Sequence, residues 1–276
     1  MSLVVLGEDV DNLALKSIAK LTGSSAIEQI TPRAFRLLGA QPHEALAARC
    51  SEASLDFAWV PDGRRLADFG LFVTDMDSTL INIECIDEIA DMQGLKSEVA
   101  EITEAAMRGE IDFRESLTRR VALLAGLHEE ALGEVYEQRL QLNPGAERLM
   151  QGLRRAGIRT VLVSGGFTYF TERLQQRLGF DHAYSNLLEV SGGKLTGRVI
   201  GDIVDGDAKA AHLTRIRDEL GLRQDQVIAA GDGANDIPML HASGFGVAYR
   251  AKPVLRSAAQ CCLDHRGLDA ILDLFA

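Results

Sequence analysis

The chain has 276 residues, of which 46% are hydrophobic and 25% charged, as is usual for a water-soluble globular protein. Its net charge of −11 excludes nucleic acid and anionic membrane as main partners, and no apolar stretch reaches the length of a membrane span. The four cysteines and six histidines lack the spacings of disulfide frameworks or zinc sites. The first residues also lack the basic and apolar regions of a signal peptide, so we expect a cytoplasmic protein.

Residues 3–60 follow the pattern β-α-β-β-α-β, a split βαβ arrangement of the size of a small open sandwich. It resembles the ACT-like regulatory modules of amino-acid enzymes, which bind an amino-acid effector. This topology hosts many unrelated functions, so a packing module or an oligomerisation module, as in a homodimer, is an equal alternative. Turn residues and charges at 61–68 indicate a linker, which divides the chain into an N-terminal module (1–68) and a core (69–276).

The core opens with an apolar run at 69–74 that stops at two carboxylates, Asp75 and Asp77. A continuously apolar strand is usually covered on both faces, as in a parallel sheet, and ligands bind beyond the carboxyl ends of such strands. Two carboxylates on one side of an extended chain repel each other unless a cation or a shared proton compensates them. Mg²⁺ is the simplest such cation. A solvated, Asp-rich turn that caps the next helix is the alternative.

Residues 84–141 have helical patterns without strand signals, which predicts a helical insertion at about 84–142. After the break at Asn143-Pro144-Gly145, apolar strands at 159–163, 226–230, 245–249 and 261–263 alternate with helices, and 187–200 is typical of a hairpin. This alternation predicts an α/β fold with a doubly wound parallel sheet.

Further polar clusters follow two of these strands. Ser164-Gly165-Gly166 offers a hydroxyl and bare backbone N–H groups for an anion, although a serine helix cap would have the same sequence. Gly231-Asp-Gly-Ala-Asn-Asp236 offers oxygen ligands, or an Asx-type turn. Carboxylates gathered with a phosphate group also need a fixed ammonium. Lys209 is the candidate, unless it is simply solvated, and Lys194 in the hairpin turn is a weaker one.

In this order the clusters resemble the four motifs of the haloacid dehalogenase superfamily of Mg²⁺-dependent phosphohydrolases. The segments 75–90, 106–121 and 163–167 are similar to the phosphoserine phosphatase family, and the resemblance covers roughly residues 69–276. It implies a Rossmann-like core in which the insertion is a small cap.

The resemblance also implies a role for each motif residue. Asp75 is the nucleophile that forms an aspartyl phosphate, and Asp77 is the general acid and then the general base. The metal ligands are Asp75, the main-chain carbonyl of Asp77 and Asp232, with Asp236 nearby through water. The phosphoryl oxygens are held by Ser164, the Gly165 N–H and Lys209, and this network is oriented by Asn235.

In the cap, Phe113, Leu117, Arg120, Val121 and Leu124 share one helical face, so Arg120 interrupts an apolar stripe and needs an anionic partner. An internal ion pair within the cap would satisfy it. The resemblance instead implies that Arg120 binds a substrate carboxylate and that Phe113 helps to exclude water.

The resemblance further implies that Glu84 binds the substrate ammonium, although a glutamate at a helix start also complements the helix dipole. We therefore expect hydrolysis of O-phospho-L-serine, the last step of serine biosynthesis. The alternatives are another small-molecule phosphatase, a phosphotransferase acting on an acceptor such as homoserine, or an amino-acid-sensing regulatory protein.

Overall fold

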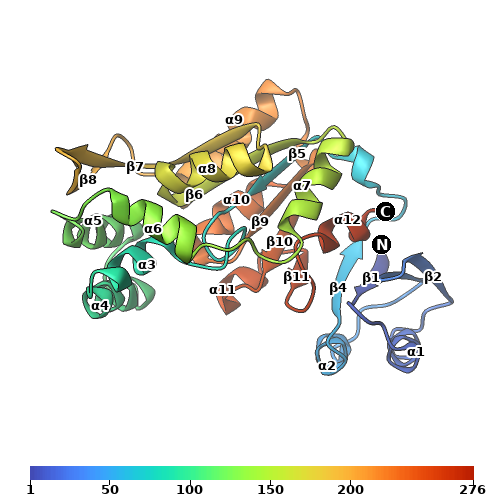
Figure 1. The fold of residues 1–276 in the computed structure, drawn as a ribbon. Helices are drawn as coiled ribbons and strands as arrows, with labels where there is room; N and C mark the ends of the chain where they lie inside the picture. The colour runs from blue at the N-terminus through green and yellow to red at the C-terminus, as the bar shows by residue number, and fades with distance from the viewer.

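Eleven strands form one continuous mixed sheet, in the order β2-β3-β1-β4-β11-β10-β9-β5-β6-β7-β8 (Figure 1). The computed structural model describes the backbone of residues 1–276 and every side chain except that of Met107. The strands span Ser2–Leu6 (β1), Ala26–Thr31 (β2), Ala34–Leu38 (β3), Asp56–Val60 (β4), Leu71–Thr74 (β5), Arg159–Phe167 (β6), His182–Ser191 (β7), Lys194–Ile200 (β8), Val227–Gly231 (β9), Phe245–Tyr249 (β10) and Cys261–Leu263 (β11).

Helices cover the sheet and build the cap. They span Asn12–Leu21 (α1), Leu46–Glu52 (α2), Cys85–Met92 (α3), Lys96–Met107 (α4), Phe113–Leu123 (α5), Glu130–Gln138 (α6), Ala146–Arg155 (α7), Thr168–Leu178 (α8), Gly206–Glu219 (α9), Ile237–Ala242 (α10), Pro253–Arg256 (α11) and Ala270–Leu274 (α12). Three short 3-10 helices span Leu66–Asp68 (η1), Gln224–Gln226 (η2) and Ala234–Asp236 (η3).

The strands from β11 to β7 are all parallel, and β5 lies between β9 and β6. Successive side chains of β5 enter different cores. Phe72 packs with α7, α8 and α12, whereas Leu71 and Val73 pack with α9 and α10 on the opposite face. Because both faces are covered, every residue of β5 is buried. The predicted doubly wound parallel core is therefore confirmed, and its coverage explains the unbroken apolar run.

The predicted helical insertion is present as α3 to α6, between β5 and β6 (Figure 1). The hairpin β7-β8 supports it, because the Gly126 N–H donates to the Leu195 carbonyl and the Leu195 N–H donates to the Leu127 carbonyl, both at 2.8 Å. The insertion ends at Gly145, whose φ of 82° lies in the left-handed region. A Cβ at this position would collide with the Asp269 carboxylate, so only glycine fits the break.

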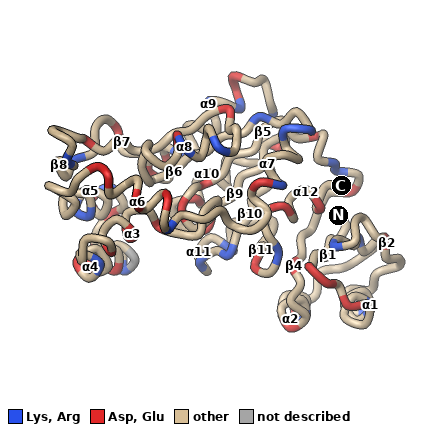
Figure 2. Tube along the Cα trace, in the orientation of Figure 1, with Lys and Arg blue, Asp and Glu red and all other residues tan. Residues whose placement is uncertain are grey.

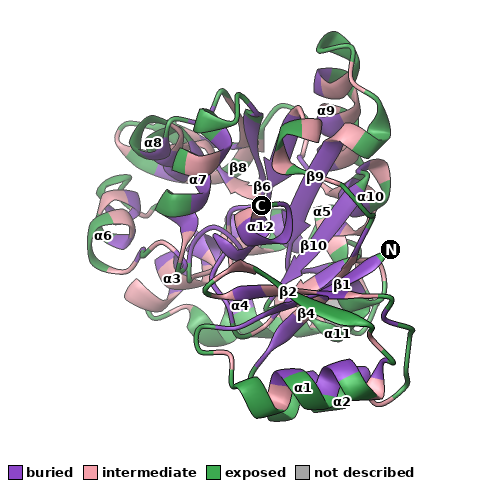
Figure 3. Ribbon diagram, turned by 90° about the vertical axis from the view of Figure 1, so that its right-hand side faces the viewer, coloured by how far each residue is buried: buried purple, intermediate pink, exposed green. Residues whose placement is uncertain are grey.

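The N-terminal module has the predicted β-α-β-β-α-β order, with antiparallel strands in the order β2-β3-β1-β4. Its sheet does not end at the expected boundary near residue 68. Strand β4 pairs antiparallel with β11, so that the module extends the core sheet. The segment expected as a linker includes η1, and the Leu66 N–H donates to the Phe275 carbonyl at 3.0 Å. At the far end of the module β2 forms an exposed edge (Figure 3).

Buried polar contacts reinforce this junction. Arg266 is fully buried in the core and lies 2.9 Å from Asp273, and it donates at 3.2 Å to the carbonyls of Gly7 and Arg33 in the module. In the other direction, Asp56 of β4 accepts three backbone N–H groups from residues 264–266. Removing such partners would leave buried charges unpaired, so these contacts hold the two parts in one arrangement.

Acidic and basic residues are interspersed along the chain trace (Figure 2). Among the residues that the structure describes, there is no helix with the length and apolar character needed to cross a membrane.

Candidate active site

Asp75 and Asp77 lie where β5 ends and the chain turns sharply. The Asp75 backbone N–H continues the sheet by donating to the Ala230 carbonyl of β9, and its carboxylate accepts the Met76 N–H at 2.7 Å. The turn places Ser78 at a φ of 54°, a conformation that non-glycine residues rarely adopt. Beyond it, the Cys85 N–H at the start of α3 donates to the Asp77 carboxylate at 3.1 Å. Both carboxylates are therefore held by backbone groups.

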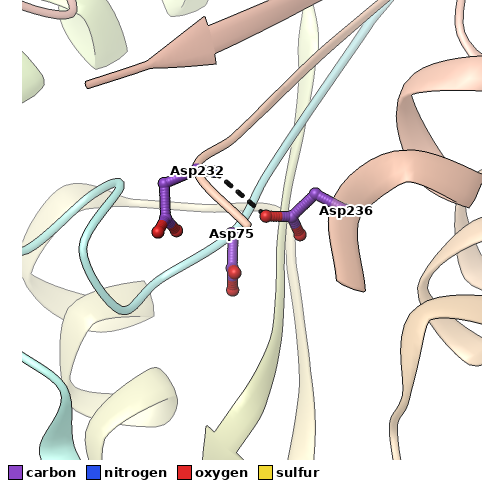
Figure 4. Close-up of side chains that lie close together, drawn as sticks. All are labelled: Asp75, Asp232 and Asp236. Carbon is purple, nitrogen blue, oxygen red and sulfur yellow. Dashed lines mark hydrogen bonds between the residues drawn. The ribbon is translucent and has the colours of Figure 1, made fainter. Parts of the chain in front are cut away.

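The second acidic motif follows β9, the neighbour of β5. Asp232 stands at the strand end, and its carboxylate accepts the Thr79 hydroxyl at 3.1 Å. Asp236, from η3, accepts the backbone N–H groups of Asp232 and Gly233 at 3.0 and 3.1 Å. Asp236 thus fixes the loop that carries Asp232, as one dashed line in Figure 4 shows.

Lys209 joins the two motifs. It lies in the first turn of α9, has no exposed surface, and places its Nζ 2.7 Å from both Asp75 Oδ2 and Asp236 Oδ1. Burial alone would lower the pKa of Lys209, but the adjacent carboxylates of Asp236 and Asp75 outweigh burial and raise it. The lysine is therefore a permanently charged ammonium at the base of the site, and a merely solvated side chain is excluded.

Carboxylate oxygens of Asp75, Asp232 and Asp236 lie within 4.8 Å of one another (Figure 4). Three buried carboxylates beside one lysine leave an excess of negative charge. Oxygen ligands of this kind suit a hard divalent cation such as Mg²⁺. Asp236 already accepts three hydrogen bonds, so Asp75 and Asp232 have more free oxygen surface for a cation.

Burial raises the pKa values of the carboxyl groups in this site. Burial, together with Asp236, raises the pKa of Asp75 well above its usual range despite the opposing charge of Lys209. Burial and the nearby Glu84 raise the pKa of Asp77 to about 7. The pKa of Asp232 is likewise raised to about 7 by burial and by Asp236. Asp77 can therefore release and accept a proton near neutral pH.

These shifts predict a pH-dependent stability for the metal-free protein. Between about pH 4 and 7 the native state binds more protons than the unfolded chain, so the free energy of unfolding should fall as pH rises through this window. We expect a loss on the order of 2–4 kcal/mol from pH 5 to pH 8 in EDTA, and a smaller loss in excess Mg²⁺, which binds the deprotonated form. Urea unfolding at both pH values measures it. The Asp77→Asn variant should show a flatter profile, and an unchanged slope would contradict the assignment.

Ser164, Gly165 and Gly166 bring the end of β6 to the same edge of the sheet. The Ser164 hydroxyl accepts the Gly166 N–H at 2.8 Å. Asn186 of β7 fixes the turn, because its amide donates to the Gly165 carbonyl at 2.7 Å. Phe113 of the cap lies against Gly165 so closely that a Cβ there would be 2.7 Å from the ring. Glycine is thus required where the cap meets the core.

Two charged residues of the cap region face the same space. Glu84, at the start of α3, accepts the Ser78 hydroxyl at 2.7 Å. Arg120 of α5 is 12% exposed, and its closest carboxylate is Asp87 at 4.0 Å, beyond hydrogen-bond distance. Burial lowers the pKa of Arg120, and the charge of Asp87 opposes this shift. The internal ion pair considered as an alternative is therefore loose and leaves guanidinium donors free.

All of these elements enclose one cavity of about 1010 Å³ between core and cap. Nine of the eleven residues predicted to bind substrate or metal or to act in catalysis line it: Asp75, Asp77, Glu84, Phe113, Arg120, Ser164, Gly165, Asp232 and Asn235. Lys209 and Asp236 lie immediately behind this lining, in contact with Asp75 and Asp232. Lys194 is at an exposed hairpin turn and has no part in the site.

The structure adds several supporting residues to the site. Thr79 and Asn186 make the hydrogen bonds to Asp232 and Gly165 described above. Lys252 lines the cavity and donates its backbone N–H to the Asp232 carbonyl at 2.9 Å. Arg114, at the start of α5, forms an ion pair with Asp205 across the junction of cap and core. Of these, only Thr79 is marked in the sequence, as one of the two hydroxyl residues directly behind Asp75 and Asp77. The others belong to helix or strand patterns without a distinctive spacing.

Comparison with known proteins agrees with this geometry. Residues 72–241 match the family model of haloacid dehalogenase-like hydrolases. The chain belongs to this hydrolase family. The resemblance inferred from the four sequence motifs is thus confirmed, and the core of the hydrolase is the Rossmann-like part of the sheet. Residues 3–46 match a second model, a domain of unknown function.

Individual relatives of this hydrolase are phosphoserine phosphatases. The one from Polaromonas sp. is 54% identical over 215 residues, which cover 76% of this chain and 91% of that one. The solved structure of a probable phosphoserine phosphatase from Vibrio cholerae has a TM-score of 0.87 at 36% identity and covers 99% of this chain and 86% of that chain. A substrate-bound phosphoserine phosphatase complex has a TM-score of 0.71 at 38% identity, over 75% of this chain and 99% of that chain.

Proposed function

We propose that this protein is a phosphoserine phosphatase, which hydrolyses O-phospho-L-serine to L-serine and phosphate as the last step of serine biosynthesis. The observation that carries the proposal is that one cavity contains both groups for phosphoryl transfer and a cation suited to a ligand carboxylate. A pair of aspartates suited to phosphoryl transfer shares this cavity with Arg120, a largely buried cation with free donors. The names of the relatives support the same substrate.

In the first step the Asp75 carboxylate attacks phosphorus, so that an aspartyl phosphate forms as the ester P–O bond breaks. Asp77 gives its proton to the departing serine alkoxide; with a pKa of about 7, it is protonated in a large fraction of molecules at neutral pH. In the second step Asp77 takes a proton from water, the water oxygen attacks phosphorus, and Asp75 is released.

The fold prepares Asp75 for this role. The Met76 N–H and Lys209 hold its two oxygens at 2.7 Å, which fixes the direction of attack, and the Lys209 ammonium opposes the rise in the pKa of Asp75 that burial causes. Mg²⁺ would be held by the carboxylates of Asp75 and Asp232 and the main-chain carbonyl of Asp77, with Asp236 nearby, and would offset the repulsion between carboxylate and phosphate.

The phosphoryl oxygens would be held by the Ser164 hydroxyl, the Gly165 N–H and the remaining N–H of Lys209. Asn235 lines the cavity beside Asp232 and would orient this network. Phe113 covers Gly165 and would exclude water from the phosphoryl group. The serine part would lie towards the cap, with its carboxylate on Arg120 and its ammonium on Glu84.

The two alternative enzymatic functions would use the same first step, the attack of Asp75 on phosphorus. A phosphotransferase would pass the phosphoryl group from Asp75 to an alcohol such as homoserine, and another phosphatase would accept a different ester. A purely regulatory protein would not need Asp77 and Lys209 in their catalytic arrangement, and this intact geometry supports an enzyme.

We assign the N-terminal module (residues 1–68) a packing role rather than that of an ACT-like amino-acid sensor or a dimer interface. Two observations support this choice: β4 is a strand of the core sheet, and Arg266 is shared between the two parts. The module lies at the opposite end of the sheet from the cap (Figure 1). Residues 69–276 would then form the catalytic unit.

The proposal predicts fast release of inorganic phosphate from O-phospho-L-serine that is lost in EDTA and restored by Mg²⁺. Sugar phosphates and p-nitrophenyl phosphate should have kcat/KM values lower by at least about 100-fold, because they lack the carboxylate and the ammonium that would bind Arg120 and Glu84. A phosphate assay on the full chain measures this. Turnover confined to other esters would overturn the substrate, and product formation that requires homoserine would favour the phosphotransferase.

A further inference from the structure

Two atoms in the cap region are buried without a hydrogen-bond partner, and they belong to facing residues. Among the side chains that the structure describes, Asp87 Oδ1 and Arg120 Nε are two of four such atoms. Both residues line the active-site cavity. Buried polar atoms are usually paired, so an unpaired donor and an unpaired acceptor on neighbouring residues of a ligand site require an explanation.

The pair spans α3 and α5, two of the three helices that line the cap side of the cavity. Asp87 lies in the first turn of α3, one helical turn after Glu84, and Arg120 lies near the end of α5. Asp87 Oδ1 is 4.0 Å from the nearest guanidinium nitrogen, close enough for charge attraction but too far for a hydrogen bond. The side chain of Asp87 is 40% exposed although Oδ1 is shielded, so the shielded oxygen is the one turned towards Arg120.

This spacing has a chemical advantage for binding a carboxylate. A close, bidentate aspartate would occupy the same N–H groups that a ligand carboxylate needs. At 4.0 Å the aspartate still attracts the guanidinium and compensates its burial, but it consumes none of the donors. Without a counter-charge the buried arginine would be costly and would turn towards other acids, of which Glu84 and Asp77 are nearby.

We propose that Asp87 is a positioning residue for substrate selection, which holds Arg120 extended and unpaired so that the guanidinium can receive a ligand carboxylate. This inference rests on the proposed function, because it assigns the carboxylate to Arg120. Asp87 itself does not contact the ligand ammonium, since its inward oxygen faces the arginine.

The test compares phosphate esters that differ by one group. O-phosphoserine has both the ammonium and the carboxylate, 3-phosphonooxypropanoate has only the carboxylate, and phosphoethanolamine has only the ammonium. In Asp87→Asn, we expect the kcat/KM ratio of 3-phosphonooxypropanoate to phosphoethanolamine to fall about tenfold, mainly through KM. Glu88→Gln is the matched control, because Glu88 is the next residue of α3 but pairs with Arg139 outside the cavity.

Asp87→Glu provides a second, independent variant. Its side chain is longer by one methylene and would reach Arg120 directly, so it should compete with the ligand carboxylate and lower the same ratio. A ratio unchanged in both variants, an equal loss for all esters, or a larger loss for phosphoethanolamine would each overturn the proposal. Failure of the proposed function is distinguishable, because the unaltered enzyme would then show no preference for O-phosphoserine over p-nitrophenyl phosphate.

Discussion

Replacing Asp75 by Asn should lower kcat for phosphoester hydrolysis by at least about 10⁴-fold while the protein remains fully folded. The amide has nearly the same shape but is a very poor nucleophile, so no aspartyl phosphate can form. Stability should not suffer in the absence of metal. Burial, followed by the charges of Asp236 and Asp232, raises the pKa of Asp75, so a neutral amide here avoids the burial of a further negative charge.

Single-turnover assays and urea unfolding in EDTA would measure both effects. Asp202→Asn is a matched control, because Asp202 is exposed and lies outside the cavity, and it should leave kcat unchanged. Activity of Asp75→Asn close to that of the unaltered enzyme would contradict the nucleophile assignment. A loss of activity accompanied by unfolding would show instead that Asp75 is needed for the fold.

Replacing Lys209 by Met should abolish turnover and also destabilise the protein by about 3–5 kcal/mol at pH 8. Lys209 is fully buried between Asp75 and Asp236, and methionine cannot replace its ammonium. Without it two carboxylates face each other unpaired. The cost should shrink towards pH 5, where Asp75, whose pKa is already raised, can take up a proton.

A double variant separates the charge effect from the loss of packing. Asp75→Asn combined with Lys209→Met removes both partners of one ion pair, and it should recover part of the stability lost in Lys209→Met. Lys194→Met is the control, since this lysine is exposed in the hairpin turn and should change the free energy of unfolding by less than about 0.5 kcal/mol. Equal destabilisation at pH 5 and pH 8 would argue against carboxylate repulsion as the cause.

Much of the site could be predicted from the sequence because parallel strands end at a common edge. The runs before Asp75, Ser164 and Asp232 were continuous and apolar, and strand-end position then implied convergence. The helical spacing of the apolar residues in 113–124 likewise places Arg120 on the apolar face of its helix. Side-chain partners such as Asn186 and the loose pairing of Arg120 with Asp87 depend on distances between elements, which no local pattern encodes.

The junction of the N-terminal module was also beyond sequence reasoning. Turn residues at 61–68 predict a linker, and the chain does pass there from β4 of the N-terminal module to β5 of the core. That local signal could not show that β4 pairs with β11, because these strands are short and their pairing joins residues 58 and 261. Nor does a lone arginine near the C-terminus suggest burial, since Arg266 is accommodated by Asp273 together with carbonyls from the other end of the chain.

The pairing of β4 with β11 also determines how late in synthesis the sheet can be completed. β4 leaves the ribosome early, whereas β11 is made close to the end, so one edge of the N-terminal sheet stays open while about 200 residues are added. Closing such a long loop is slow, and an open strand edge can pair with another chain in the meantime. The completed protein hides that edge, but the growing chain depends on its last strands to do so.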